Sequence, residues 1–337
     1  MTRRHIQIIL GVLWLLDGAL QLQPFMFTSG FAHQIIEPAA TGQPAAVAAS
    51  VHWAAHLIAA APVLTNTAFA LGQLLLGAGL LWARTARWSL AASIGWALAV
   101  WWLGEGLGGL ASGHALLLTG APGAVALYAL AAAMAWPEHP SRVDSPGDRW
   151  SSHTTPPTWA APAWALVWTG GALLQVLPGN GAVQALASSA DDAPGPLASL
   201  DRALASALGA DSTAVTITVA VVTAAVGLAA LAPRSWRTAA AWSGIALALL
   251  FWVIGQGAGQ LTSGQSTDPD AGPLLVLLGA AVLSTQGTPR IRESILEPRN
   301  PAPEQPASMP ARRHHPSVAR PAPVTSATNH PPGEAAL

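Results

Sequence analysis

The chain is divided into eight apolar runs, and this pattern most constrains its fold. A helix needs about 20 apolar residues to cross the roughly 30 Å of bilayer hydrocarbon, and each run is close to that length. Only 9% of the residues are charged, whereas soluble domains have about 25%. We therefore expect an all-α integral membrane protein. The runs lie at about 6–24, 64–83, 88–104, 121–136, 159–178, 212–233, 238–255 and 271–285.

The arginines predict how the chain is oriented. If the eight apolar runs cross a membrane one after another, the arginines before the first run, between runs and after the last run fall on one side, except Arg202. The positive-inside rule then places the N-terminus and the C-terminus in the cytoplasm of a multi-pass plasma-membrane protein. The residues on that side are Arg3, Arg4, Arg84, Arg87, Arg142, Arg149, Arg234, Arg237, Arg290, Arg292 and Arg299.

The two halves of the chain resemble each other. "WLLDGALQLQP" (14–24) aligns with "WTGGALLQVLP" (168–178), and "GEGLGGLASG" (104–113) aligns with "GQGAGQLTSG" (255–264), after which Pro122 matches Pro273. Each copy holds four spans, so both copies enter the membrane from the same side. We therefore expect two parallel four-helix repeats (4+4), related by an axis along the membrane normal.

This pattern divides the chain into four parts. Residues 1–137 form the first transmembrane repeat and 159–286 the second. Residues 138–158 are polar and Pro-rich, as expected of a cytoplasmic linker. Residues 287–337 carry Pro throughout without apolar periodicity, which predicts a disordered cytoplasmic tail.

Polar residues within the runs are candidates for an ion site. Asp17 and Gln21 are four residues apart and share a helix face, as do Asn66 and Gln73. A carboxylate inside a span costs about 2.5–3.5 kcal/mol on insertion scales, so it should face the bundle interior. The functional reading is an ion or proton relay, and the alternative is hydrogen bonding between helices. The second repeat has Gly171 in place of Asp17.

The glycines around Glu105 match G-x-G-x-x-G, but an apolar span precedes them instead of a strand, so they do not indicate a dinucleotide site. They are more typical of close backbone approach or of an unwound helix end on the outer side. We expect the repeats to meet there, with Glu105 and Gln256 facing one another or a shared cavity. The alternative is a simple Gly-rich turn. Since Asp17 and Glu105 belong to the first repeat, any chemistry is expected in that repeat.

Histidines suggest a weaker, separate possibility. His52 and His56 are four residues apart, a spacing that suits two metal ligands on a helix, and His33, Glu37 and His114 are predicted on the same side. Together they could bind Cu or Zn. The alternative is that these are interfacial histidines without a metal. The chain has no Cys, which excludes thiolate sites and disulfides.

The strings "LGVLWLLDGALQL" (10–22) and "LGQLLLGAGLLWARTAR" (71–87) resemble DoxX-like four-helix membrane proteins. "WLLDGALQLQP" and "WWLGEGLGGL" are also similar to an uncharacterised family of multi-span membrane proteins from GC-rich Gram-positive bacteria. DoxX-like proteins are associated with quinone-linked redox complexes, so this resemblance implies an accessory role in such a complex. It carries no catalytic residue to this chain.

Three functions are compatible with the sequence. The first is a secondary or passive transporter of a small solute or ion through an outward-facing cavity between the repeats, since the chain has no ATP-binding P-loop. The second is an accessory subunit of a redox complex, and the third is a scaffold for a membrane complex. An enzyme is not expected. The net charge of −1 gives no indication of nucleic-acid binding, so the expected partners are the lipid bilayer and a membrane complex.

Overall fold

The computed structural model describes residues 1–138, 154–177, 180–209 and 212–285. Within these ranges the secondary structure is helical and contains no β-strand. Most of the predicted linker and the whole predicted tail lie outside the described residues. The described chain has a first half, residues 1–138, and a second half, residues 154–285.

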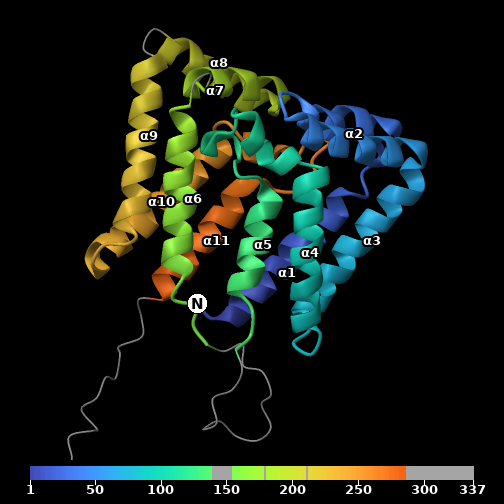
Figure 1. Cartoon of the computed structure of the whole chain (residues 1–337), viewed down its shortest axis with the longest axis horizontal. Coiled ribbons are helices and arrows are strands. Elements are labelled where there is room, and N and C mark those ends of the chain that lie inside the picture. Colours follow the sequence, from blue (N-terminus) through green and yellow to red (C-terminus); the bar gives the residue numbers. More distant parts are fainter. Residues whose placement is uncertain (139–153, 178–179, 210–211, 286–337) are drawn as a thin grey trace, which may run out of the picture. The chain divides into compact units, whose positions relative to one another are not determined.

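In the first half, α1 packs along α3 and α4 packs along α5. Helix α2 lies across the end of α3 and α4, next to short helical turns (Figure 1). The elements in chain order are α1 (Arg3–Leu20), η1 (Pro24–Phe27), η2 (Phe31–Ile36), η3 (Glu37–Ala40), α2 (Ala45–Ala60), α3 (Pro62–Leu81), α4 (Ala86–Leu103), η4 (Gly106–Ser112), η5 (Leu117–Thr119) and α5 (Ala124–Met134).

The second half has the same order of pairings. Helix α6 packs along α9 and α10 packs along α11, while α7 and α8 lie across the end of the bundle at the same end as α2 (Figure 1). Helices α5 and α11 touch each other and so join the halves. The elements are α6 (Ala160–Gln175), α7 (Ala182–Asp192), α8 (Gly195–Leu208), α9 (Ser212–Ala229), α10 (Arg234–Val253), η7 (Gly257–Gln260) and α11 (Ala271–Ser284).

Three helices, α3, α9 and α10, are long and apolar enough to cross a membrane. Helix α4 together with η4, which bends away by 49°, would be a fourth. Helices α5 and α11 have 11 and 14 residues, so at 1.5 Å per residue they rise only about 16 and 21 Å. The prediction is thus confirmed for an all-helical chain with membrane-length apolar helices. Helix α5 is shorter than the predicted run 121–136 because a loop takes the place of its first turn, whereas α11 matches the predicted run 271–285.

Apolar side chains fill the core and also cover much of the outside of the described residues. Large apolar residues on the outside are widely exposed: Leu75 and Leu166 are each 72% accessible. Polar residues such as Asp17 and Gln175 are buried, at 2% and 1%. Soluble monomers rarely expose such extensive apolar surface. This surface is compatible with insertion into lipid.

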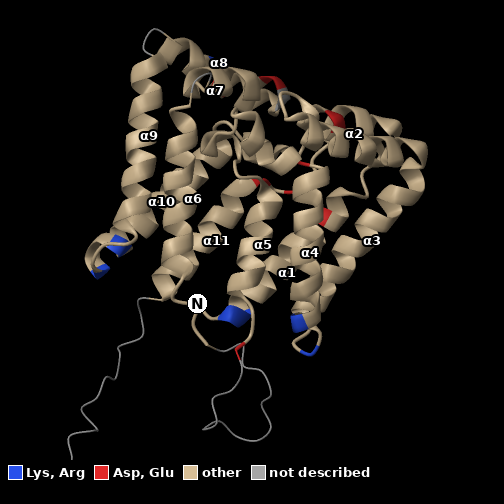
Figure 2. Ribbon diagram, viewed as in Figure 1, with Lys and Arg blue, Asp and Glu red and all other residues tan. Residues whose placement is uncertain are grey.

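Arginines lie at the end of the bundle where α1 begins, as the blue segments of Figure 2 show. The α3–α4 turn contributes Arg84 and Arg87, and Arg234 and Arg237 begin α10. The Arg87 guanidinium lies 5.3 Å from the ring centre of Trp88, which is 70% exposed. Basic and tryptophan side chains at one end of apolar helices are typical of a membrane interface.

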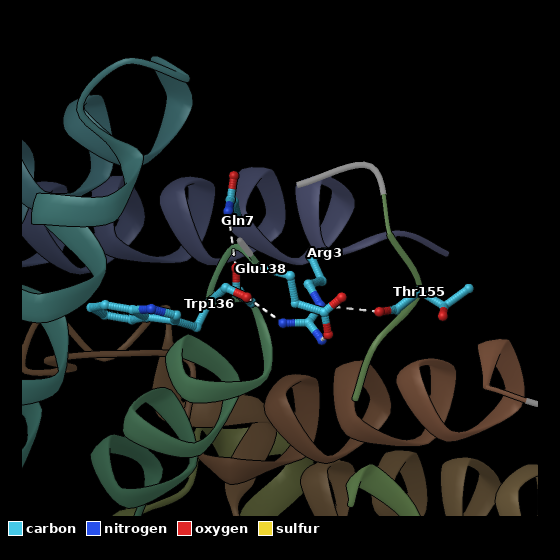
Figure 3. A network of polar contacts seen from close by, with 6 residues as sticks. Arg3, Gln7, Trp136, Glu138 and Thr155 are labelled. Carbon is cyan, nitrogen blue, oxygen red and sulfur yellow. Dashed lines mark hydrogen bonds and ion pairs between the residues drawn. The ribbon is translucent and has the colours of Figure 1, made fainter. Parts of the chain in front are cut away.

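At this end the N-terminus of α1 is tied to the end of α5 (Figure 3). The buried guanidinium of Arg3 donates hydrogen bonds to the Trp136 carbonyl and to the Thr155 carbonyl, and pairs with Glu138. One turn further along α1, Gln7 Nε2 donates to the Ala135 carbonyl over 2.9 Å. These contacts join both ends of the segment that connects the halves.

Glycines bring α1 and α3 into close contact. A Cβ at Gly77 would lie 2.7 Å from the Gly11 carbonyl oxygen, closer than a real side chain allows. Gly227 has the same place on α9, where a Cβ would lie 2.9 Å from the Thr169 backbone nitrogen. Small residues at such positions let membrane helices pack backbone against backbone.

Candidate functional site

After α4 and α10 the backbone turns left-handed in the same way. Four consecutive residues have positive φ in each half: 106–109 at 54°, 60°, 60° and 73°, and 257–260 at 53°, 53°, 68° and 51°. Leu107 and Ala258 adopt this conformation although L-residues pay about 1–2 kcal/mol for it. Both segments thus leave the α-helical conformation, as expected of an unwound helix end.

The unwound segments let the side chain after each long helix bind the start of the next short one. Glu105 Oε1 accepts a hydrogen bond from the Val125 amide at 3.4 Å, in the first turn of α5. Gln256 Oε1 accepts one from the Gly272 amide at 3.0 Å, in the first turn of α11. Both side chains thus satisfy an amide that has no partner within its own helix.

Matching tryptophans support this equivalence. The indole of Trp101 donates to the Pro122 carbonyl and that of Trp252 to the Pro269 carbonyl, both over 2.7 Å. The structure therefore pairs Pro122 with Pro269, and the sequence match with Pro273 is corrected. The loop before the proline is shorter in the second half, which an alignment by residue identity does not detect.

Glu105 and Gln256 do not face one another. Gln256 Nε2 points across the boundary between the halves and lies 3.5 and 3.4 Å from the carbonyl oxygens of Leu117 and Leu118. The halves thus meet here, as predicted, but Glu105 and Gln256 line separate cavities.

The larger cavity has a volume of about 650 Å³, within the range of small-molecule sites. It lies between α1, α2, α3, α4 and the start of α5, and the loop before α11 closes one side. Its walls are largely apolar, yet four carboxylates line it. Among the described lining residues none is Arg or His. The carboxylates are those of Asp17, Glu105, Asp268 and Asp270.

Several polar atoms at this cavity have no hydrogen-bond partner among the described residues. They are Asp17 Oδ1, Gln21 Oε1, Gln73 Oε1 and Glu105 Oε2. The Tyr128 hydroxyl interacts with the Asp17 carboxyl. Buried polar atoms are nearly always paired, so a ligand or water in the cavity would satisfy the other three oxygens. The structure thus brings together the predicted residues Asp17, Gln21, Gln73 and Glu105 around one cavity.

Asn66 has a different role from its predicted neighbours. It is fully buried, and its Nδ2 donates to the Gln21 backbone carbonyl over 2.7 Å. This bond joins α3 to the end of α1, so the alternative of interhelical hydrogen bonding is confirmed for Asn66, through the backbone of its partner.

Asp268 and Asp270 were missed in the sequence. They come from the second half, so the cavity lined by Asp17 and Glu105 also receives carboxylates from the second half; the expectation that any chemistry lies in the first half stays a prediction. Burial and the nearby Asp268 raise the pKa of Asp270 to about 7, and burial raises the pKa of Asp268 as well. The one available signal was an Asp before an apolar run, since Asp270 Oδ1 accepts the Ala271 amide at 2.5 Å as a helix cap.

Aromatic side chains make up much of the apolar lining of the larger cavity. Trp14, Phe31, Trp53, Phe69 and Trp96 line the cavity. The Trp14 indole donates to Ser93 Oγ over 2.7 Å, which fixes its ring. The rings of Phe69 and Trp96 pack edge to face with centres 5.5 Å apart. The wall is therefore built of rings held in place by other contacts.

The second cavity, of about 420 Å³, lies at the boundary between the halves. His114, Gln184, Gln256 and Gln260 line it, so it is more polar than the first. Asp270 and Thr119 line both cavities. These two residues therefore separate the larger cavity from the smaller one.

The histidines do not form the predicted metal site. Glu37 lies between His33 and His52, with oxygen–nitrogen distances of 2.9 and 3.6 Å, and His33 lowers the pKa of the Glu37 carboxyl through its hydrogen bond. His114 lies at the second cavity instead. In the part of the chain that the structure describes, no three such side chains are placed to hold a metal ion. The reading of His52 and His56 as interfacial histidines fits better than Cu or Zn binding.

Comparisons with protein-family models, with curated proteins and with solved structures found no match. The resemblance to DoxX-like proteins therefore stays an expectation from the residues.

Proposed function

We propose that this protein is a multi-pass membrane transporter, secondary or passive, for a small cationic solute that enters the larger cavity from the outer side. One observation carries the proposal: four carboxylates line a largely apolar cavity in which no described lining residue carries positive charge. Buried charges are costly unless paired, so these groups must hold protons or a cation. A site that exchanges the two has the chemistry of an ion-coupled transporter.

The short helices support this function. α5 and α11 begin within the protein after irregular backbone, and Glu105 and Gln256 accept hydrogen bonds from amides in their first turns. Irregular backbone at membrane depth persists only where protein or water surrounds it, and broken helices mark the binding sites of many transporters. Since α5 and α11 also touch each other, movement between the halves would act directly on the cavity.

The 4+4 topology with cytoplasmic termini belongs to this proposal. Each of the eight apolar runs holds a helix, and the helix pairings recur in the same order. Reporter fusions after Pro137 and after Thr285 should report the cytoplasm, and a fusion after Thr41 should report the outer side. An outer-side signal at Pro137 or Thr285 contradicts the topology.

Transport is tested by reconstituting the purified full chain in proteoliposomes on a solid-supported membrane. Concentration jumps of benzyltrimethylammonium, Na⁺ and K⁺ chlorides are applied in separate runs. We expect at least one cation to give a transient current or, if it exchanges for protons, a change of lumenal pH read by an entrapped pH-sensitive dye. The signal should be absent in empty liposomes and reduced in Asp17→Asn. Neither a current nor a lumenal pH change for any cation, as in empty liposomes, refutes transport.

Copurification distinguishes the accessory role implied by the resemblance. A stoichiometric oxidoreductase that stays with the solubilised protein would favour the redox-complex alternative. The carboxylates argue against a quinone in this cavity, because a neutral quinone head offers no positive charge to offset them.

A further inference from the structure

The carboxylates of the larger cavity form one electrostatic group. Asp268 lies close enough to interact with both Asp17 and Glu105, and Asp270 interacts with Glu105. These residues come from three separate parts of the chain: α1, the end of α4, and the loop before α11. The loop of the second half thus completes a negative wall in the first half.

Polar atoms at this wall are oriented for a ligand. Asp17 is only 2% exposed; its carboxyl interacts with the nearby Tyr128 hydroxyl, and its Oδ1 makes no hydrogen bond of normal geometry with a described residue. Gln21 Oε1, one helical turn away, also has no hydrogen-bond partner among the described residues. Both side chains line the cavity and present acceptors, which suit a positively charged donor or cation.

The cavity is poorly suited to a small inorganic cation. Ca²⁺ takes six to eight oxygen ligands, roughly 2.3–2.6 Å away, and Mg²⁺ needs a near-octahedral shell. No three carboxylate or histidine side chains of the described residues converge in that way. A volume of about 650 Å³ with largely apolar walls also cannot replace the hydration shell of such an ion.

Aromatic rings provide the apolar contacts for a ligand in this cavity. Trp14, Phe31, Phe69 and Trp96 line the same cavity as the carboxylates. Ring faces attract ammonium groups, and they bury the apolar body of a ligand. A cavity lined by both carboxylates and aromatic rings suits a molecule with a charged head and an apolar body.

We infer that the larger cavity binds an organic ammonium, with its head between Asp17, Glu105 and Asp268 and its apolar body against the aromatic wall. This inference rests on the proposed function for its physiological meaning and names the class of solute. It concerns binding alone and can hold even if nothing is transported.

The test measures binding to the full chain in nanodiscs by calorimetry and tryptophan fluorescence. The probes are benzyltrimethylammonium, tetramethylammonium, which lacks the ring, and benzenesulfonate, which has the ring and a negative charge. We expect saturable binding of the first, at least tenfold weaker binding of the second, and none of the third. Equal affinity for benzyltrimethylammonium and benzenesulfonate, or no binding of benzyltrimethylammonium, overturns the inference.

Variants locate the site. Asp17→Asn should weaken benzyltrimethylammonium at least tenfold, and Phe69→Leu should weaken it several-fold while changing tetramethylammonium little. The control Asp191→Asn removes an exposed carboxylate of α7, away from both cavities, and should bind as the parent protein does. If Asp17→Asn does not fold, Glu105→Gln replaces it. Unchanged affinity in the folded cavity variant refutes the site.

The binding experiment and the transport experiment have independent outcomes. Saturable binding of benzyltrimethylammonium with neither a current nor a lumenal pH change leaves the inference standing and refutes transport. Currents for Na⁺ or K⁺ without binding of the organic probe support transport and refute the organic ammonium.

Discussion

Replacing Glu105 with Gln separates the two roles that the structure gives this side chain. Oε1 accepts the Val125 amide at 3.4 Å, and Oε2 lies at the cavity without a described partner. Gln keeps an amide acceptor for Val125 but removes the negative charge. The helix cap should survive, while the attraction for a cation is lost.

The expected magnitudes differ enough to be told apart. A long hydrogen bond of this kind contributes about 1 kcal/mol, so Glu105→Gln should change the free energy of unfolding by no more than about that amount. An ammonium about 5 Å from a carboxylate, at an effective dielectric constant of about 20, gains about 3 kcal/mol. Since about 1.4 kcal/mol is a tenfold change in affinity, cation binding should weaken on the order of a hundredfold.

The matched variant is Gln256→Glu at the equivalent place in the second half. Gln256 Nε2 faces the carbonyl oxygens of Leu117 and Leu118, and a carboxylate there would meet both without a proton to donate. Leaving such groups unsatisfied costs about 1–3 kcal/mol, so this variant should melt lower. Because Gln256 does not line the larger cavity, the folded protein should still bind the cation.

Benzyltrimethylammonium affinity by calorimetry and the midpoint of thermal unfolding by intrinsic fluorescence are measured on all three proteins. Parent-like affinity in Glu105→Gln would show that Glu105 is only a helix cap. A similar loss of affinity in both variants, with similar melting points, would refute the distinction between the halves.

Three other perturbations test the packing and the electrostatics. Gly77→Ala should lower the melting temperature because its Cβ would lie 2.7 Å from the Gly11 carbonyl oxygen. The control Gly95→Ala has no atom within 4 Å of the new Cβ, so it should be neutral or slightly stabilising. Equal effects of the two substitutions would contradict the close α1–α3 packing. Arg3→Met should cost about 2–4 kcal/mol by leaving buried carbonyls unpaired, as seen in chemical unfolding, and a neutral result would refute the anchoring role. The pKa of Asp270 is raised to about 7, so the protonated carboxyl contributes to stability at low pH, and this contribution is lost as the pH rises through about 7. Over the same pH range the affinity for the cation should rise, and binding should release protons into a weak buffer. Affinity that is independent of pH would show that Asp270 does not take part.

Local pattern alone determined that this chain is helical and apolar on its outside. The eight apolar runs and the Arg-bearing breaks report the preferences of single helices, and these depend on nearby residues. The run of glycines after Trp102 likewise predicted an unwound helix end, because positive φ is a local property of the backbone.

Only the tertiary structure decided which polar groups share a cavity. Asp268 follows Asp17 by more than 250 positions, yet a loop of the second half carries it to the wall that Asp17 and Glu105 form. No periodicity reports such a contact, since it depends on how α5 and α11 pack and on where their preceding loops end. The tertiary structure also decided where the side chain of Gln256 points, although Gln256 matches Glu105 in the alignment of the two halves. The packing of the two halves turns it toward the Leu117 and Leu118 carbonyls instead, because the hydrogen bonds of a buried amide depend on neighbours that the sequence does not place.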